Sequence, residues 1–216
     1  MMKHILVYGD SLAWGIIPGT RKRLSFNKRL SGVVESQLLA QGQAVRVIEN
    51  CLNGRRTVWD DPFKAGRDGS EGLAQAIEIC SPLALVVLIL GTNDFQVMHP
   101  HNAWMSGQGM EKLITIIRQA PIEPGMPVPD ILMVVPPKML SPTGPVADKF
   151  EGAEHKCIGL AEAYKKVAAE QQVYFFDSAD ITTASRVDGI HLDENQHQLL
   201  GQALADVIKC IVKIQE

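Results

Sequence analysis

The feature that most constrains the fold of this chain is an uninterrupted aliphatic run from Leu83 to Leu90. A strand with one face in water alternates apolar and polar side chains, whereas an unbroken apolar run is typical of a parallel strand covered on both faces. The run is far too short to cross a bilayer. It therefore predicts the central strand of an α/β sheet with helices packed on both sides.

The rest of the chain alternates between strand-like and helix-like stretches. Short apolar runs predict four more strands, at residues 5–8, 45–48, 131–135 and 173–176. Apolar residues at helical spacing predict helices over residues 30–38, 73–80, 110–117, 157–167 and 199–212. Asp193 and Gln196 are spaced as a capping box for the last helix. Because such alternation implies parallel strands joined by right-handed helical crossovers, we predict a three-layer α/β/α sandwich with a five-stranded parallel sheet, as a single domain over residues 1–216.

Charge and composition exclude several classes of protein. The 21 basic and 24 acidic residues give a net charge of −3, and no basic block occurs, which argues against nucleic acid as a partner. No stretch is long and apolar enough to predict a membrane span. A cleavable signal peptide would have to remove the turn that follows the first predicted strand, so we expect a cytoplasmic protein.

No cofactor or metal is expected. The chain has neither of the glycine-rich motifs that cradle phosphates, nor a Gly-x-Ser-x-Gly nucleophile elbow. His99 and His101 lie two residues apart without an obvious third ligand, which makes a weak metal site, and His197 is expected on the surface. The four cysteines are isolated, which predicts reduced, mostly buried thiols and leaves a cysteine nucleophile as a minor alternative: Cys51, Cys80, Cys157 and Cys210.

Polar turn residues follow the predicted strands. Ser11 lies in Gly9-Asp10-Ser11-Leu12 after the first strand, Gly54 follows the second, and Asn93 follows the third. The pair Asp188 and His191 precedes the last helix. Since the carboxyl ends of parallel strands meet at one edge of a sheet, we expect these residues to converge there.

The converging residue types suit acyl transfer. A serine needs a base to take its proton, and a carboxylate three residues before His191 can orient that base. The N–H groups of Ser11 and Gly54 and the side-chain amide of Asn93 are candidate donors to an oxyanion. Each residue also has a structural alternative: Ser11 as a helix cap, Gly54 as a positive-φ turn, and Asn93, Asp188 and His191 as loop residues.

At these residues the chain resembles the SGNH hydrolases of the GDSL esterase/lipase superfamily, whose four name residues match Ser11, Gly54, Asn93 and His191. The matching motifs are Tyr8-Gly-Asp-Ser-Leu12, Asn53-Gly54-Arg55, Leu90-Gly-Thr-Asn-Asp94 and Asp188-Gly-Ile-His191. Further similarity to the bacterial arylesterase/acyltransferase subgroup lies in Ser11-Leu-Ala-Trp-Gly15, Asp60-Asp-Pro62 and Phe150-Glu-Gly152.

The resemblance implies a flavodoxin-like sheet, a Ser11–His191–Asp188 triad and an oxyanion hole from Ser11, Gly54 and Asn93. It also implies activity on short-chain or aryl esters, transfer of acyl groups to alcohols in some relatives, and assembly into a homo-oligomer. A carbohydrate acetylesterase, a thioesterase and a non-catalytic binding module are the alternatives. We expect Trp14, Phe150 and Ile190 to line the substrate site, with loops over residues 96–107 and 136–147 setting its depth.

Overall fold

The computed structural model describes residues 2–214 and contains one sheet of five parallel strands in the order β2-β1-β3-β4-β5. The strands are β1 (Lys3–Gly9), β2 (Val45–Cys51), β3 (Leu85–Ile89), β4 (Asp130–Val135) and β5 (Tyr174–Asp177). This is the parallel α/β sheet that the alternation of strands and helices predicts.

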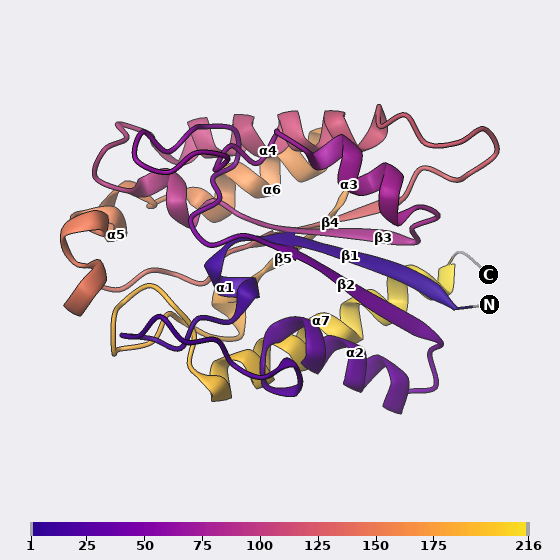
Figure 1. Cartoon of the computed structure of the whole chain (residues 1–216), viewed down its shortest axis with the longest axis horizontal. Helices are drawn as coiled ribbons and strands as arrows, with labels where there is room; N and C mark the ends of the chain where they lie inside the picture. The colour runs from indigo at the N-terminus through magenta and orange to yellow at the C-terminus, as the bar shows by residue number, and fades with distance from the viewer. Residues whose placement is uncertain (1, 215–216) are drawn as a thin grey trace.

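Helices cover both faces of the sheet (Figure 1). One face is covered by α3 (Leu73–Cys80), α4 (Ala103–Arg118) and α6 (Leu160–Glu170), with the short α5 (Ala153–Lys156) beside them. The other face is covered by α1 (Ser11–Trp14), α2 (Leu30–Ala40) and α7 (Glu194–Ile214). Among the described residues, no helix combines the length and apolarity that a membrane crossing requires.

Successive side chains of the central strand β3 alternate between two apolar cores. Val86 and Leu88 pack into the core under α3, α4 and α6, whereas Leu85 and Val87 pack into the core under α2 and α7. Every residue of β3 is buried. An aliphatic side chain is therefore needed at each position, which is the physical origin of the uninterrupted run in the sequence.

The helices differ from the prediction at three places. Helix α4 begins at Ala103, where Asn102 caps it, so the second half of the expected 96–107 loop is helical. The helix expected over residues 157–167 begins only at Leu160, as α6, because its N-cap Gly159 has a φ of +86°, and the separate helix α5 ends at Lys156. The last helix begins at Glu194, and half of the predicted capping box is present, with the Asp193 N–H donating to Gln196 Oε1 at 2.6 Å.

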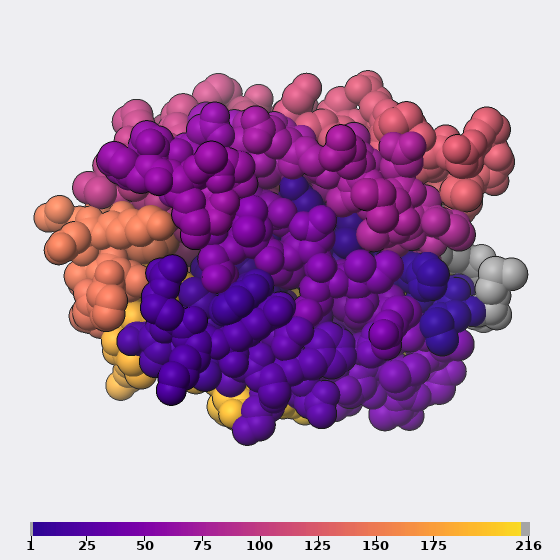
Figure 2. Space-filling model, in the orientation of Figure 1, coloured from indigo at the N-terminus to yellow at the C-terminus, as the bar shows by residue number. Residues whose placement is uncertain are grey.

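The carboxyl ends of the strands lie together at the left edge of Figure 1, where the long connections gather. Figure 2 shows the surface of the loops after β1 and β2, in indigo and purple, meeting the segment around α5, in orange, at that edge. The residues that the sequence singles out for chemistry all belong to these connections.

Candidate active site

Ser11 stands where β1 gives way to α1. Asp10 caps this short helix, and its carboxylate accepts a hydrogen bond from the Leu12 N–H at 2.9 Å. The capping role that Ser11 alone could suggest is thus filled by Asp10. The hydroxyl of Ser11 instead faces His191, and only 6% of the serine is exposed.

His191 and Asp188 complete a hydrogen-bonded chain with Ser11. His191 Nε2 lies 3.1 Å from Ser11 Oγ, and His191 Nδ1 lies 2.8 Å from Asp188 Oδ2. Gly189, between the two, has a φ of +78°, and a Cβ there would lie 2.5 Å from the carbonyl oxygen of Ser141. A glycine is therefore required for the turn that brings the carboxylate back to the imidazole.

Asp188 is held in its ionised form. Its Oδ1 accepts hydrogen bonds from the N–H groups of Ile190 (3.0 Å) and His191 (2.9 Å), and its Oδ2 also accepts one from the Gly19 N–H (3.0 Å). Burial by itself would raise the pKa of Asp188, but the hydrogen bonds from the His191 ring and from the N–H groups of His191 and Ile190 hold that pKa well below its usual range. An ionised Asp188 keeps the proton of His191 on Nδ1, which leaves Nε2 free to accept the proton of Ser11.

The three candidate oxyanion donors differ in the hydrogen bonds that they already make. Gly54 has a φ of +85°, and neither its N–H nor that of Ser11 donates to a protein acceptor within residues 2–214. The Asn93 amide nitrogen donates to Asp10 Oδ2 at 2.9 Å and to the Arg55 carbonyl at 3.1 Å. Both amide hydrogens of Asn93 therefore have acceptors, so a substrate oxygen would have to replace one of them.

Gln96 orients the Asn93 amide from the opposite side. Its Nε2 donates to Asn93 Oδ1 at 2.6 Å, and its own Oε1 accepts a hydrogen bond from Arg56 Nη2 at 2.5 Å. Gln96 is fully buried. Because a guanidinium can only donate, it fixes which end of the Gln96 amide faces Asn93, and hence which end of Asn93 faces Asp10.

Arg56 links two of the candidate oxyanion residues. Its side chain is completely buried, and its Nη1 donates to the Gly54 carbonyl at 3.1 Å and to Asp61 Oδ2 at 3.1 Å. One guanidinium thus contacts Gly54 directly and reaches Asn93 through Gln96. The sequence analysis did not assign a role to Arg56 or Gln96. The position of Arg56, two residues after Gly54 and five before Asp61, was a signal for its role.

Two further carboxyl groups are buried behind the site. Burial raises the pKa of Asp10 to about 6 and that of Asp94 to about 6. Asp94 accepts hydrogen bonds from the N–H and the hydroxyl of Thr57, both at 2.9 Å, and from Ser106 Oγ at 2.6 Å. The side chain of Asp94 therefore ties the segment after Gly54 to the turn η2 (Thr92–Phe95), which carries Asn93.

His99 and His101 serve this loop packing. Their rings stack with centroids 4.7 Å apart, and the ring of His101 packs against Trp59. His99 Nε2 accepts a hydrogen bond from Arg56 Nε at 2.6 Å, and burial together with that charge lowers the pKa of His99 to about 4. No group of three or more His, Cys, Asp or Glu side chains in the described part of the chain is arranged to hold a metal ion.

The residues expected to line the substrate site have different environments. Trp14 is half-buried at the end of α1, and the guanidinium of Arg23 lies 4.6 Å from its ring centroid. Phe150 and Ile190 are 4% and 1% exposed and pack into the core under α3, α4 and α6. Their contact with substrate stays a prediction.

Two expectations about side chains on the surface and in the interior are wrong. His197 is fully buried, neither of its ring nitrogens has a partner within the described residues, and burial lowers its pKa to about 4. The four cysteines are free thiols, as predicted, but Cys51, Cys80 and Cys157 are only half-buried and Cys210 is exposed. Burial raises the pKa of Cys51, the one nearest the site in sequence, to about 12, which makes it a poor nucleophile.

Solved structures of two bacterial enzymes resemble this chain over nearly their whole length. The native aryl esterase of M. smegmatis is 34% identical, with 97% of this chain and 99% of that chain covered and a TM-score of 0.91. Est24, a carbohydrate acetylesterase from Sinorhizobium meliloti, is 32% identical, with the same coverage and a TM-score of 0.91. Comparison with curated proteins gives no match.

A match to a family model establishes the family. The model of the GDSL-like Lipase/Acylhydrolase family matches residues 7–199, a range that includes Ser11, Gly54, Asn93, Asp188 and His191. Together with the solved relatives above 30% identity, this match shows that the chain belongs to the GDSL esterase/acylhydrolase family, as its four motifs predict.

Proposed function

We propose that this protein is a serine esterase that hydrolyses short-chain acyl or aryl esters through a covalent acyl-enzyme on Ser11. The observation that carries the proposal is the continuous chain of hydrogen bonds from Ser11 Oγ through both nitrogens of His191 to Asp188. A serine hydroxyl is a weak nucleophile until a positioned base accepts its proton. Here the base, and the carboxylate that orients it, are both buried and in hydrogen-bond contact.

In the first half of the reaction, Ser11 Oγ attacks the ester carbonyl carbon while its proton passes to His191 Nε2. The imidazolium formed is stabilised by the ionised Asp188, 2.8 Å from Nδ1. The tetrahedral intermediate collapses when the C–O bond to the alcohol breaks and His191 returns the proton to the departing oxygen. The second half repeats these steps with water, which His191 deprotonates, and Ser11 is the leaving group.

The negative charge on the tetrahedral oxygen needs donors that are already in place. We assign this role to the N–H groups of Ser11 and Gly54, which have no protein acceptor in the described structure. Asn93 is the third donor. One of its amide hydrogens leaves the Arg55 carbonyl, which is the longer of its two contacts, and donates to the substrate oxygen instead. Each donor of this kind is typically worth about 10²–10³ in rate.

The similarity to an aryl esterase supports aryl esters as substrates, and the similarity to Est24 favours acetylated carbohydrate as the second candidate. Thioester hydrolysis and transfer of the acyl group to an alcohol would use the same acyl-enzyme. A cytoplasmic location and a homo-oligomer stay predictions, as does a single domain over residues 1–216, which the single sheet supports.

Turnover of p-nitrophenyl acetate by the wild type, Ser11→Ala and Ser36→Ala tests the proposal. Ser36 is an exposed residue of α2 and is the matched control. We expect Ser11→Ala to lose about 10³-fold or more in kcat and Ser36→Ala to keep the wild-type rate. Equal rates in wild type and Ser11→Ala would refute the proposal, and failure of a fluorophosphonate to label Ser11 would favour a non-catalytic binding module. A panel of aryl esters and acetylated sugars then separates the two substrate classes.

A further inference from the structure

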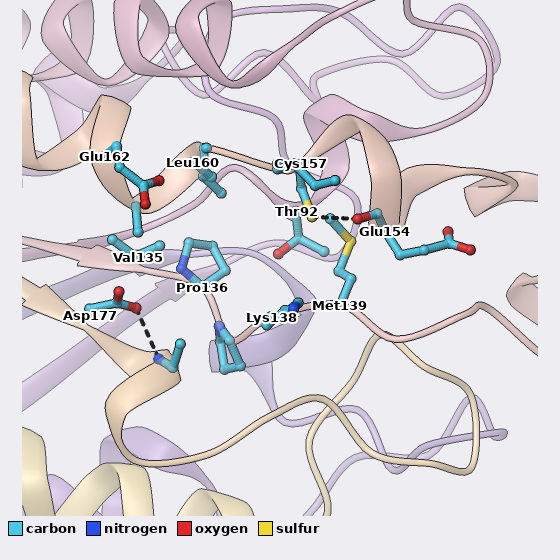
Figure 3. A pocket seen from close by; sticks show the side chains of 15 residues that line it. Thr92, Val135, Pro136, Lys138, Met139, Glu154, Cys157, Leu160, Glu162 and Asp177 are labelled. Atoms are coloured by element: carbon cyan, nitrogen blue, oxygen red, sulfur yellow. Dashed lines mark hydrogen bonds between the residues drawn. The ribbon is translucent and has the colours of Figure 1, made fainter.

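A pocket separate from the triad lies at the carboxyl end of β4. It has a volume of about 210 Å³ and lies between the segment that follows β4 and the α5–α6 connection. Figure 3 shows its apolar walls, which are formed by Val135, Pro136, Met139, Cys157 and Leu160. The described residues that line it do not include Ser11, Asp188 or His191.

The side chain of Thr92 supplies an unpartnered hydroxyl to this pocket. Thr92 is 1% exposed, and its Oγ1 is buried without a hydrogen-bond partner in the described structure. In Figure 3 this oxygen points toward the middle of the pocket. A buried hydroxyl without a hydrogen-bond partner destabilises the folded protein. A ligand that forms a hydrogen bond with Thr92 would remove this cost.

The other polar groups around the pocket do not compete for that role. Asp177 accepts a hydrogen bond from the Ala179 N–H at 2.9 Å, and Cys157 Sγ lies 3.6 Å from the Glu154 carbonyl. The Glu154 carboxylate, whose Oε2 also lacks a partner, points away from the pocket in Figure 3. Lys138 and Glu162 also line the pocket, but both are exposed residues. Thr92 Oγ1 is therefore the buried, unpartnered polar atom that a ligand inside the pocket would meet.

Size and polarity define the class of ligand. An apolar cavity of about 150 Å³ holds a benzene molecule, so 210 Å³ has room for an aromatic ring with one or two further heavy atoms. An ion is disfavoured because apolar walls cannot replace its hydration. We propose that this pocket is a second binding site, for a small uncharged aromatic molecule that carries one hydroxyl or carbonyl group, which hydrogen-bonds to Thr92.

The walls of the pocket continue into the active site. Thr92 directly precedes Asn93 in η2. On the other side, the Lys138 carbonyl accepts a hydrogen bond from the Ala184 N–H at 3.1 Å, and the Leu140 N–H donates to the Gly189 carbonyl at 2.9 Å. A ligand in the pocket would thus contact the segment that carries Asn93 and a segment bonded to the Asp188–His191 turn.

Benzyl alcohol and toluene, titrated into the Ser11→Ala protein and followed by NMR, test the proposal independently of catalysis. We expect saturable binding of both. Thr92→Val should weaken benzyl alcohol about 5–10-fold, the worth of one hydrogen bond, and leave toluene unchanged. Thr92→Val should also raise the Tm of the free protein by about 2–4 °C, because the unpartnered hydroxyl is gone. In the control Thr115→Val, whose hydroxyl already bonds to the Glu111 carbonyl, neither effect is expected.

A second pair of variants tests the location. Ala161 lines the pocket from α6, so Ala161→Phe should fill it and abolish binding of both ligands. Ala169 is exposed on the same helix, and Ala169→Phe should leave binding unchanged. Two results would overturn the proposal. One is that neither ligand shows saturable binding, which is also the result expected if the Thr92 hydroxyl holds only water. The other is that Ala161→Phe binds the ligands as the wild type does.

Discussion

The contact between Gln96 and Asn93 leads to a quantitative prediction. Gln96→Glu replaces an amide nitrogen by oxygen at nearly unchanged shape, so it removes the donor to Asn93 Oδ1, now 2.6 Å away. The new carboxylate can still accept the hydrogen bond from Arg56 Nη2. The substitution therefore tests the orientation of the Asn93 amide and leaves the arginine paired.

Two limits bracket the effect. If Asn93 keeps its orientation, the site loses one hydrogen bond with a net worth of about 0.5–1.5 kcal/mol, which corresponds to a fall in kcat of about 2–13-fold. If the amide turns to escape the facing carboxylate, the oxyanion loses a donor worth about 10²–10³ in rate. Turning is opposed because it would place Asn93 Oδ1 against Asp10 Oδ2 and the Arg55 carbonyl. We expect kcat to fall about 10–100-fold with KM little changed, because the donor acts mainly in the transition state.

Steady-state hydrolysis of p-nitrophenyl acetate, normalised to the sites that a fluorophosphonate titrates, measures this effect on folded and reactive protein only. Gln119→Glu, at the exposed end of α4, makes the same charge change away from the site and should keep wild-type kcat. A kcat for Gln96→Glu within about twofold of wild type would show that Gln96 does not govern the oxyanion donor, and our account of the Arg56–Gln96–Asn93 chain would be wrong.

Two further predictions concern stability. Asp61→Ala leaves the fully buried Arg56 without its carboxylate, and we expect urea unfolding to show a loss of about 3–5 kcal/mol; a loss below about 1 kcal/mol would contradict the pairing. His197 has a folded pKa of about 4 against an ordinary 6.5, so the unfolded chain takes up a proton first as the pH falls, and stability is lost between pH 6.5 and 4. This loss is about 3 kcal/mol, so the difference in unfolding free energy between wild type and His197→Phe should change by that amount between pH 7 and 4. A difference that does not depend on pH would refute the lowered pKa of His197.

Much of the architecture, and the meeting of Ser11, Asp188 and His191, could be predicted from the sequence. The aliphatic run at Leu83–Leu90 predicts a strand buried on both faces, and β3 is such a strand. Ser11 and His191 are far apart in the sequence, yet their meeting could be expected, because carboxyl ends of parallel strands share one edge of a sheet. Periodicity also contained a signal that we missed: His197 lies three residues before Leu200, on the stripe of α7 that faces the core.

What the sequence determined by itself is thus the class of sheet, the edge at which the motifs meet and the residue types able to perform acyl transfer. Only the tertiary structure decided that Arg56 and Gln96 orient Asn93, that Phe150 and Ile190 pack in the core, and that Thr92 faces a second pocket. The physical reason is that hydrophobic periodicity records which face of an element is buried. The paths of the loops after the strands have no such period, and those paths choose the hydrogen-bond partners of each side chain.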